Sequence, residues 1–385
     1  MVQDSYIALF NENKALFQAD KPLWWETKLT EAINLLADKE IESFKDAYAL
    51  DYGINVRRLP FQGDPFSLFR CDIPGLATSN YLVLNDSFYA QVAEANLPKG
   101  VIICSLSNAF KNYADLIKPY LQQTNVSSSD MAINTLLAQD GMFIYIPDGV
   151  QLEKPIQLVN LMYGKVDMMA VSHNLAIIGE NAKAQVLVCD HAYGEEVNYL
   201  SNRLTQVFVG KNSTYEHYKL ESSSSKTTNI STLQIYQEEG SQVLSNLITL
   251  ANGKTHNRVE ANLNGKGAYL SLNGLGLGQD SEKIENHTFI NHNVAGATSY
   301  RIYRRGAGTD YWYYLGDVSA TQNTFFDKES SLVSSGNYYR YTVRASYDGK
   351  DSSGKDYLIY SGFDTNGLYL KYVATPKLTS ITNAT

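Results

Sequence analysis

Apolar strands and glycine turns alternate at a nearly fixed interval in the middle of the chain. Five glycines lie 30, 31, 30 and 25 residues apart, and each follows a short apolar run: they are Gly149, Gly179, Gly210, Gly240 and Gly265. A fixed period of this length is typical of stacked supersecondary units that bury their apolar residues only against neighbouring units. The pattern therefore predicts a β-solenoid over residues 141–298.

The segment after each glycine indicates which side of its strand is buried. In Ala182–Val188, small and branched residues occupy every second position, which is the period of a half-buried strand. In Val243–Leu250 both alternating sets are largely apolar, as expected of a strand that is covered on both sides. An antiparallel meander of hairpins would give the same period, so the strand direction stays open between these two arrangements.

Helical periodicity precedes the solenoid. In residues 1–50 the apolar positions recur at helical spacing and predict two amphipathic helices. A strand is expected over Val101–Leu106, and Ser107 is expected to cap the helix that follows. Ser127–Ser129 should begin a last helix before the solenoid. We therefore assign residues 1–140 to a helical and mixed α/β region.

The sequence changes character after residue 298. The last 87 residues hold 13 of the 28 tyrosines and neither cysteine nor histidine, and their alternating strands come with turns rich in Gly, Ser and Asp. This pattern is typical of a β-sandwich, which we expect to be partial over 299–375, with the start of a further repeat over 376–385. The predicted fold class is thus mainly β: a helical and α/β N-terminal region, a parallel β-helix core and an incomplete C-terminal sandwich.

Composition and charge exclude several classes of protein. Residues 299–385 carry 10 basic and 8 acidic side chains and the remainder carries 22 and 32, so neither part offers nucleic acid a basic surface. The N-terminus lacks a signal-peptide pattern and no long apolar run follows, so we expect a cytoplasmic protein without a membrane segment. Cys71, Cys104 and Cys189 are odd in number and widely spaced, which favours buried thiols over a disulfide framework.

Candidate metal ligands are sparse. Cys189 and His191 lie two apart on a predicted strand, hence on one face, where they could contribute to a metal or cluster site. A buried thiol beside a structural imidazole explains them better, because no further ligands follow at a metal-site spacing. His287 and His292 are five apart, which on a strand places them on opposite faces. We therefore predict no catalytic, cofactor-binding or metal-binding residue.

Two glycine-containing segments match nucleotide-binding motifs only in part. Gly253–Thr255 resembles the end of a phosphate-binding loop, but Ile248 stands where that motif needs its first glycine, so a turn is predicted. Gly274, Gly276 and Gly278 alternate on a strand instead of opening a helix. This alternation favours close packing of coils over dinucleotide binding.

Five ordered segments within residues 1–298 carry a resemblance to a known family. They are Asp51–Leu59, Leu136–Pro147, Glu153–Asn160, Leu187–Ala192 and Asn286–Ile290. These segments resemble the SufD family, scaffold subunits of the SUF iron-sulfur cluster assembly machinery. The resemblance implies a right-handed parallel β-helix flanked by helical regions, no enzymatic activity, and pairing with the paralogue SufB and the ATPase SufC. It also implies that ATP is bound by SufC, so no cofactor is expected on this chain alone.

The chain departs from the SufD pattern at two places. A proline- and lysine-rich segment is missing between Phe44 and Tyr52, and the family's Cys-Ser-His-Gly segment and ATPase-docking helices do not follow Asn293. Residues 299–385 instead resemble a fibronectin type III repeat of bacterial surface proteins that lacks its first two strands. We therefore expect a chimeric chain whose binding to SufB is weak and whose binding to SufC is undetectable.

The junction leads to two structural expectations. An uncapped solenoid end exposes unpaired backbone groups, so Tyr300–Arg304 should pair with Ile284–Ile290 as a cap. A sandwich without two of its strands exposes edges and half its core, so residues 296–385 should not fold alone.

Two rival functions remain beside the scaffold role. A surface-exposed binding or adhesion protein is favoured only by the C-terminal part, where tyrosines could stack on glycans, although core and cross-strand pairs explain most of them. A β-helix polysaccharide lyase or hydrolase would need paired carboxylates or a basic cleft on one sheet face, and the sequence indicates neither. Acidic residues such as Glu238 and Glu239 lie at turns instead.

Overall fold

The fold is known from a computed structural model that describes most of the chain. It describes residues 2–49, 52–54, 61–68, 76–90, 96–194, 196–251, 253–278, 282–293, 299–306, 311–319, 325, 327, 338–350, 356–360 and 368–371. Cys71 and the further repeat expected over 376–385 lie outside these residues, so those two expectations stay predictions. None of the helices in these ranges is long and apolar enough to cross a membrane.

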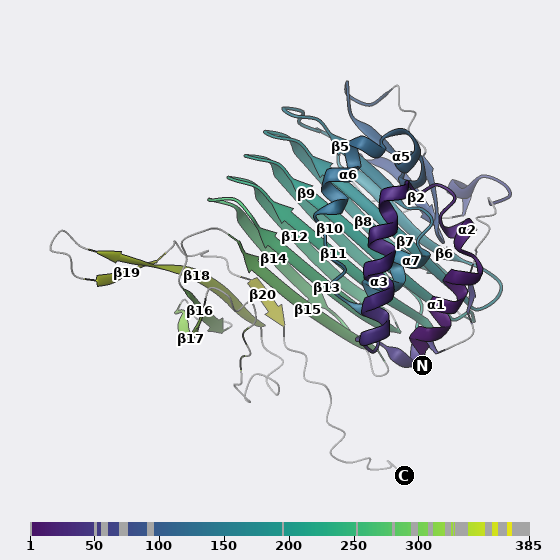
Figure 1. The fold of residues 1–385 in the computed structure, drawn as a ribbon. Coiled ribbons are helices and arrows are strands. Elements are labelled where there is room, and N and C mark those ends of the chain that lie inside the picture. Colours follow the sequence, from purple (N-terminus) through teal and green to yellow (C-terminus); the bar gives the residue numbers. More distant parts are fainter. Residues whose placement is uncertain are drawn as a thin grey trace, which may run out of the picture.

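Two sheets form the walls of a β-helix (Figure 1). Sheet A runs in spatial order through β15 (Lys283–His292), β13 (Lys254–Leu263), β11 (Thr227–Gln237), β9 (Tyr199–Val209), β7 (Met168–Ile178), β5 (Met142–Ile146) and β4 (Ile102–Ser105), with β1 (Gly53–Ile54) beside β7. Sheet B contains β14 (Tyr269–Gly276), β12 (Gln242–Ala251), β10 (Thr214–Ser222), β8 (Lys183–Tyr193), β6 (Ile156–Tyr163), β2 (Ser79–Leu84) and β3 (Ser87–Ala90). The chain alternates between the sheets from β5 to β15, and the successive strands within each sheet are parallel. The solenoid is therefore confirmed, and the antiparallel meander is wrong.

One corner of the β-helix carries the periodic glycines. A Cβ atom on Gly210 would lie 2.8 Å from the carbonyl carbon of Gly179, and one on Gly265 would lie 1.9 Å from the backbone nitrogen of Glu239. Gly240 has a φ of 67°, a left-handed conformation that side chains other than glycine's adopt at a cost. Successive coils therefore touch backbone to backbone at this corner, which explains the period seen in the sequence.

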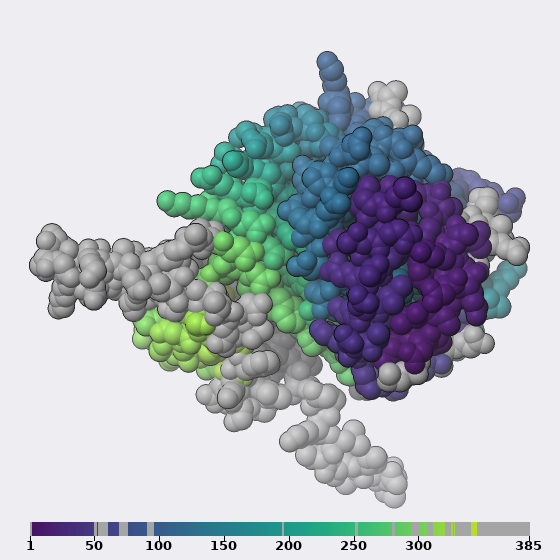
Figure 2. All heavy atoms as spheres, in the orientation of Figure 1, coloured from purple at the N-terminus to yellow at the C-terminus, as the bar shows by residue number. Residues whose placement is uncertain are grey.

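Helices cover the outer face of sheet A (Figures 1 and 2). They are α1 (Val2–Glu12), α2 (Lys14–Phe17), η1 (Leu23–Trp25), α3 (Glu26–Asp38), α4 (Lys45–Tyr48), α5 (Leu106–Asn112), α6 (Ala114–Gln122) and α7 (Ser129–Leu137), and a separate short turn, η2, spans Pro65–Ser67. Leu29 of α3 and Ile133 of α7 join one buried cluster with Leu175 and Leu204 of sheet A. The helical N-terminal region is thus packed onto the solenoid by an apolar face, as its periodicity predicted.

One of the two predicted helix caps is confirmed, and the other is wrong. Ser128 caps α7, because its hydroxyl accepts a hydrogen bond of 3.2 Å from the backbone of Met131. Ser105, and not Ser107, caps α5: its hydroxyl accepts a hydrogen bond of 3.1 Å from the backbone of Asn108. The expectation was wrong by two positions because β4 ends at Ser105, whose extended backbone suits the N-cap position.

The C-terminal strands form a small antiparallel sheet. They are β16 (Ser299–Gly306), β17 (Tyr313–Ser319), β18 (Tyr338–Lys350), β19 (Asp356–Tyr360) and β20 (Leu368–Lys371). The last of these, β20, also pairs in parallel with β14, which makes the C-terminal strands continuous with sheet B. A fibronectin-like sandwich is therefore not confirmed by the described residues.

The expected cap at the end of the solenoid is wrong in its pairing. Tyr300–Arg304 belongs to β16, which pairs with β17 on one side and β18 on the other, and Ile284–Ile290 lies in β15, the end strand of sheet A. The two antiparallel neighbours satisfy both edges of β16, so it has no edge left for β15. Tyr300 still touches this region, because its hydroxyl donates a hydrogen bond of 2.7 Å to the His292 carbonyl.

Candidate functional site

The interior of the β-helix is apolar toward the glycine corner and ionic toward the opposite corner. Val186, Val207 and Ile235 belong to the apolar interior cluster. Asp190 lies further along the same strand as Val186, and Arg203 lies earlier on the strand that carries Val207. The inward-facing side chains therefore change from hydrocarbon to charge across the width of each sheet.

Four buried ionisable residues on consecutive strands form this ionic interior. Asp190 of β8 lies 3.8 Å from Arg203 Nε and 3.3 Å from Lys219 Nζ, and Lys219 Nζ lies 3.6 Å from Glu221 Oε2 on the same strand, β10. All four side chains are at least nine-tenths buried. Such charges are tolerated in an interior only when they are paired and hydrogen-bonded.

Neutral amides and hydroxyls make further hydrogen bonds with this network. Asn160 donates to Asp190 (2.6 Å), Lys219 donates to Ser231 (2.8 Å) and Asn257 (3.1 Å), and Thr249 (3.2 Å) and Thr255 (3.1 Å) donate to Glu221. These partners come from strands of both sheets, so the network ties several coils together.

Burial and pairing set the protonation of the interior groups. Burial opposes ionisation of Asp190, but Lys219 and Arg203 outweigh it, so the pKa of Asp190 lies below its usual value. Burial raises the pKa of Glu221 in spite of the nearby ammonium of Lys219. Burial, with a contribution from Lys219, lowers the pKa of His217 to about 4, so His217 is neutral at pH 7. The network is thus suited to holding coils in register.

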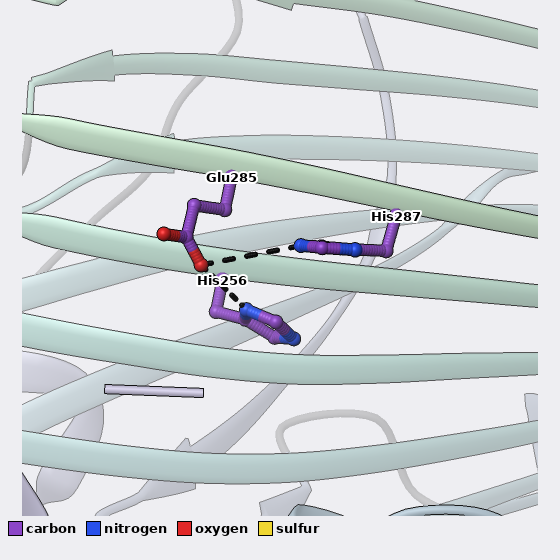
Figure 3. Close-up of side chains that lie close together, drawn as sticks. All are labelled: His256, Glu285 and His287. Atoms are coloured by element: carbon purple, nitrogen blue, oxygen red, sulfur yellow. Dashed lines mark hydrogen bonds and ion pairs between the residues drawn. The ribbon is translucent and has the colours of Figure 1, made fainter. Parts of the chain in front are cut away.

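A second polar cluster lies on the outer face of sheet A, at the end of the solenoid (Figure 3). His256 Nδ1 lies 3.1 Å from Glu285 Oε2, and His287 Nε2 lies 4.0 Å from the same oxygen. The two imidazole rings stack with their centroids 4.8 Å apart. Exposure of the side chains rises from 5% at His256 through 27% at Glu285 to 47% at His287, so the cluster opens toward solvent.

The parallel register of two strands brings these three side chains together. His256 of β13 is the direct partner of Glu285 on β15, and His287 is two positions further along β15. Alternate residues of a strand point to the same side, so Glu285 and His287 share the outer face with His256. Phe44, from the segment before α4, packs edge-on against His256, with ring centroids 6.2 Å apart.

The surroundings of Glu285 and His287 shift their pKa values. Burial opposes ionisation of Glu285, but hydrogen bonds from Lys283 and His256 outweigh it and lower the pKa of Glu285. Burial and the neighbouring His256 lower the pKa of His287. A carboxylate and neutral imidazole nitrogens are the states in which these groups bind metal ions.

The structure places the predicted cysteine and histidine pair on the outer face of β8. Cys189 is fully buried in a small apolar cluster with Val159 and Leu161. His191 Nδ1 lies 3.0 Å from the Ser222 carbonyl oxygen. Among the described residues, the group of three potential metal ligands lies elsewhere, at His256, Glu285 and His287.

The histidines of β15 lie on opposite faces of the strand. His287 points outward, and His292 stacks on Tyr300 with ring centroids 4.9 Å apart. Sequence reasoning weighed His287 only against His292 and missed His256 and Glu285. A signal was present, because His256 and Glu285 are 29 residues apart, close to the length of one coil.

The glycine-containing segments are structural parts of coils. A Cβ on Gly253 would lie 2.1 Å from the Ser225 carbonyl oxygen, so this segment is a tight turn between coils. A Cβ on Gly276 would lie 3.3 Å from Ile284, which agrees with close packing, but one on Gly274 would meet nothing within 4 Å. Both glycines line a cavity of about 60 Å³ near the end of the solenoid.

Two family models match successive parts of the chain. The SufBD protein N-terminal region matches residues 1–158, and the SUF system FeS cluster assembly SufBD core domain matches residues 161–310. The first covers the helical layer and the start of the β-helix. The second covers the remaining coils and continues through β16, past the boundary expected at residue 298.

Curated relatives with the same family name are similar at low identity. The iron-sulfur cluster assembly protein SufD of Bacillus subtilis is 25% identical over 49% of this chain and 44% of its own length. The SufBD family protein slr0076 of Synechocystis is 23% identical over 54% of this chain and 45% of its own length. The chloroplastic SufBD family protein ABCI8 of Arabidopsis thaliana is 30% identical over 29% of this chain and 20% of its own length. The chain spans less than half the length of these relatives. The two models together span more than half of the chain, in their natural order, and this places residues 1–310 in the SufBD family.

Proposed function

We propose that this chain is a non-catalytic scaffold subunit of a cytoplasmic SUF iron-sulfur cluster assembly complex. The observation that carries the proposal is the ordered match of both SufBD regions onto one continuous body, the helical layer and the β-helix. Curated relatives named for iron-sulfur cluster assembly support the same system.

The chemistry of the described residues agrees with a scaffold. The interior charges of Asp190, Arg203 and Lys219 are engaged with one another and with amide and hydroxyl groups inside the solenoid. Groups used in this way stabilise stacked coils and are not presented to a substrate. Iron-sulfur clusters would then be cargo of the assembled complex, and ATP would be bound by a SufC-type partner.

Partner binding tests the proposal. The untagged chain should be captured weakly by a SufB-type paralogue and not detectably by a SufC-type ATPase, because residues after Asn293 do not resemble the family's ATPase-docking helices. A full-length SufD-type protein serves as the control that retains both partners. Retention of the ATPase at the level of that control would contradict the expected partner pattern, and loss of all SufB binding would contradict the scaffold role.

The non-catalytic part of the proposal has its own test. The purified chain should hydrolyse no ATP, and anaerobic reconstitution with iron and sulfide should leave no stoichiometric cluster. Stoichiometric iron and sulfide that disappear in Cys189→Ala would contradict this expectation and assign Cys189 to a cluster site.

A surface-binding role for the C-terminal strands is the second candidate function. Tyr311, Tyr313 and Tyr314 are 67%, 51% and 53% exposed, which leaves aromatic rings available for stacking. Binding of the chain to a glycan array, lost in Tyr313→Ala, would favour this role. Absence of binding on such an array would favour the scaffold alone.

A further inference from the structure

We propose that His256, Glu285 and His287 bind one divalent transition-metal ion, for which Zn²⁺ and Co²⁺ are suitable probes. The site lies on the outer face of sheet A at the last two strands of that sheet, and Figure 3 shows the three side chains converging there. The inference does not depend on the proposed scaffold role, because it concerns only these residues and a free metal ion.

The geometry of the donor atoms is close to that of a metal site. The potential ligand atoms of the three residues all lie within 4.8 Å of one another, and His256 Nδ1 approaches Glu285 Oε2 to 3.1 Å. Donors around a tetrahedral zinc ion lie about 3.4 Å apart, since each bond is about 2.1 Å long. The half-exposed side chain of His287 has room to move the remaining distance. The buried ring of His256 is held in place against Phe44.

The ligand types point to the class of metal. Two imidazoles and one carboxylate suit zinc, iron(II) and related first-row ions and leave further coordination positions for water. His287 is the most exposed of the three, so these open positions face solvent.

The cations around the site have partners of their own. Lys283 Nζ pairs with Glu285 Oε1 at 2.6 Å, which leaves Oε2 toward the histidines. Arg258 pairs with Glu42 and Glu260 and lies over the ring of Phe289. On the helical side, Asp130 contributes a negative field at His256, although burial raises the pKa of Asp130. The site therefore holds a single carboxylate as its charged ligand, and we expect a modest affinity.

The competing explanation is a structural hydrogen bond between His256 and Glu285 without any metal. That bond needs only two residues, whereas a metal site also needs His287. His287 is thus the residue whose replacement separates the two explanations. Its exposure makes the variant His287→Gln suitable, because the fold does not rest on that side chain.

The test is a Co²⁺ titration of the full-length, tag-free chain at neutral pH, followed by visible absorption and displacement with Zn²⁺. We expect one equivalent of Co²⁺ to bind with d–d bands that Zn²⁺ removes. Loss of an outer-shell partner weakens metal binding about 10- to 100-fold. His287→Gln and Glu285→Gln each remove a proposed direct ligand, so each should weaken Co²⁺ binding by at least this factor. His191→Gln, which removes a histidine from the outer face of β8, should bind like the unaltered chain.

A second measurement keeps the test independent of folding. Zn²⁺ should raise the midpoint of thermal unfolding of the unaltered chain and of His191→Gln, but not of His287→Gln, because an ion that binds only the folded state stabilises it. The metal-free midpoints of the three proteins should agree, which shows that the variants are folded. The proposal is overturned if no Co²⁺ bands form, if His287→Gln binds as tightly as the unaltered chain, or if His191→Gln loses binding equally.

Discussion

Charged side chains gather in two regions of this β-helix, and their surroundings give them different properties. The interior network of Asp190, Arg203, Lys219 and Glu221 is sealed between the sheets and paired within itself. The outer cluster of His256, Glu285 and His287 opens to solvent and leaves nitrogen and oxygen donors accessible. We refer to them below as the interior network and the outer cluster.

The comparison shows how the same parallel register serves two purposes. In both regions, side chains on neighbouring strands are aligned because parallel coils repeat their register. Inside, alignment pairs charges that have no access to water, so they must satisfy one another. Outside, alignment gathers ligands that remain able to bind a solute. Removing one member should therefore be costly inside and nearly neutral outside.

The largest effect is expected for Asp190→Asn. The amide keeps the shape but removes the anion that Arg203 and Lys219 share, so two buried cations lose their partner. We expect a loss of about 3–5 kcal/mol in the free energy of unfolding, measured by chemical denaturation. The control is Asp38→Asn at the exposed end of α3, which should change stability by about 0.5 kcal/mol or less. Equal changes in both variants would show that the interior network does not stabilise the fold.

The second expected effect is a pH dependence of the unfolding free energy, caused by buried histidines. Burial lowers the pKa of His173 and of His217 to about 4, whereas the unfolded chain has the usual value near 6.5. Between these values the unfolded chain binds more protons than the folded one, so stability falls as pH falls. Each histidine should cost up to about 1.4 kcal/mol per pH unit in this window. The measurement is the unfolding free energy at pH 7, 6 and 5.

Two variants test whether the pH dependence of stability arises in the interior of the β-helix or in the outer cluster. His217→Gln should flatten the dependence, because it removes one of the buried neutral imidazoles. His287→Gln in the outer cluster should change the slope less than His217→Gln does, because half of the His287 side chain is exposed. A slope that responds to His287 and not to His217 would reverse the comparison between the two regions.

A smaller effect is expected for Thr255→Val. The variant keeps the shape of the side chain and removes the hydroxyl that donates to Glu221 at 3.1 Å. We expect a loss of about 1–3 kcal/mol, since a buried acceptor would lose a donor. Thr30→Val, on the exposed side of α3, is the matched control and should cost less. Equal losses of stability in the two variants would mean that the buried hydroxyl of Thr255 contributes no more than the exposed hydroxyl of Thr30.

The smallest effect is expected in the outer cluster without metal. Glu285→Gln and His287→Gln, measured in the presence of a chelator, should each change the unfolding free energy by about 1 kcal/mol or less, as is usual for partly exposed pairs. A loss as large as that of Asp190→Asn would show that the outer cluster is as integral to the fold as the interior network.

Features governed by local backbone chemistry could be predicted from the sequence. The spacing of Gly179 and Gly210 predicted the coils, because the close approach of neighbouring backbones excludes a side chain at both positions. The alternation in Ala182–Val188 predicted the buried side of β8. The sequence does not decide between Ser105 and Ser107, because serine is a good cap at either position and only the end of β4 selects Ser105.

Features that depend on contacts between coils could not be predicted in this way. Asp190 and Glu221 are partners on neighbouring strands but lie 31 residues apart in the sequence, so no local pattern shows that they meet. The expected pairing of β16 with β15 was wrong for a related reason. One of the strands that pair with β16 is β18, which is distant from it in the sequence. Comparing positions one coil length apart would have found His256 beside Glu285.

The corner of stacked glycines also decides where this protein can accept extra residues. The segments 179–182, 210–213 and 238–241, at that corner, each join two strands through four residues. At the opposite corner, residues 165–167 in the connection between β6 and β7 are exposed. An insertion at 210–213 would separate coils whose backbones touch at Gly179 and Gly210, whereas Val166 is 67% exposed. Fusion of a reporter domain should therefore succeed at 165–166 and fail at 210–213.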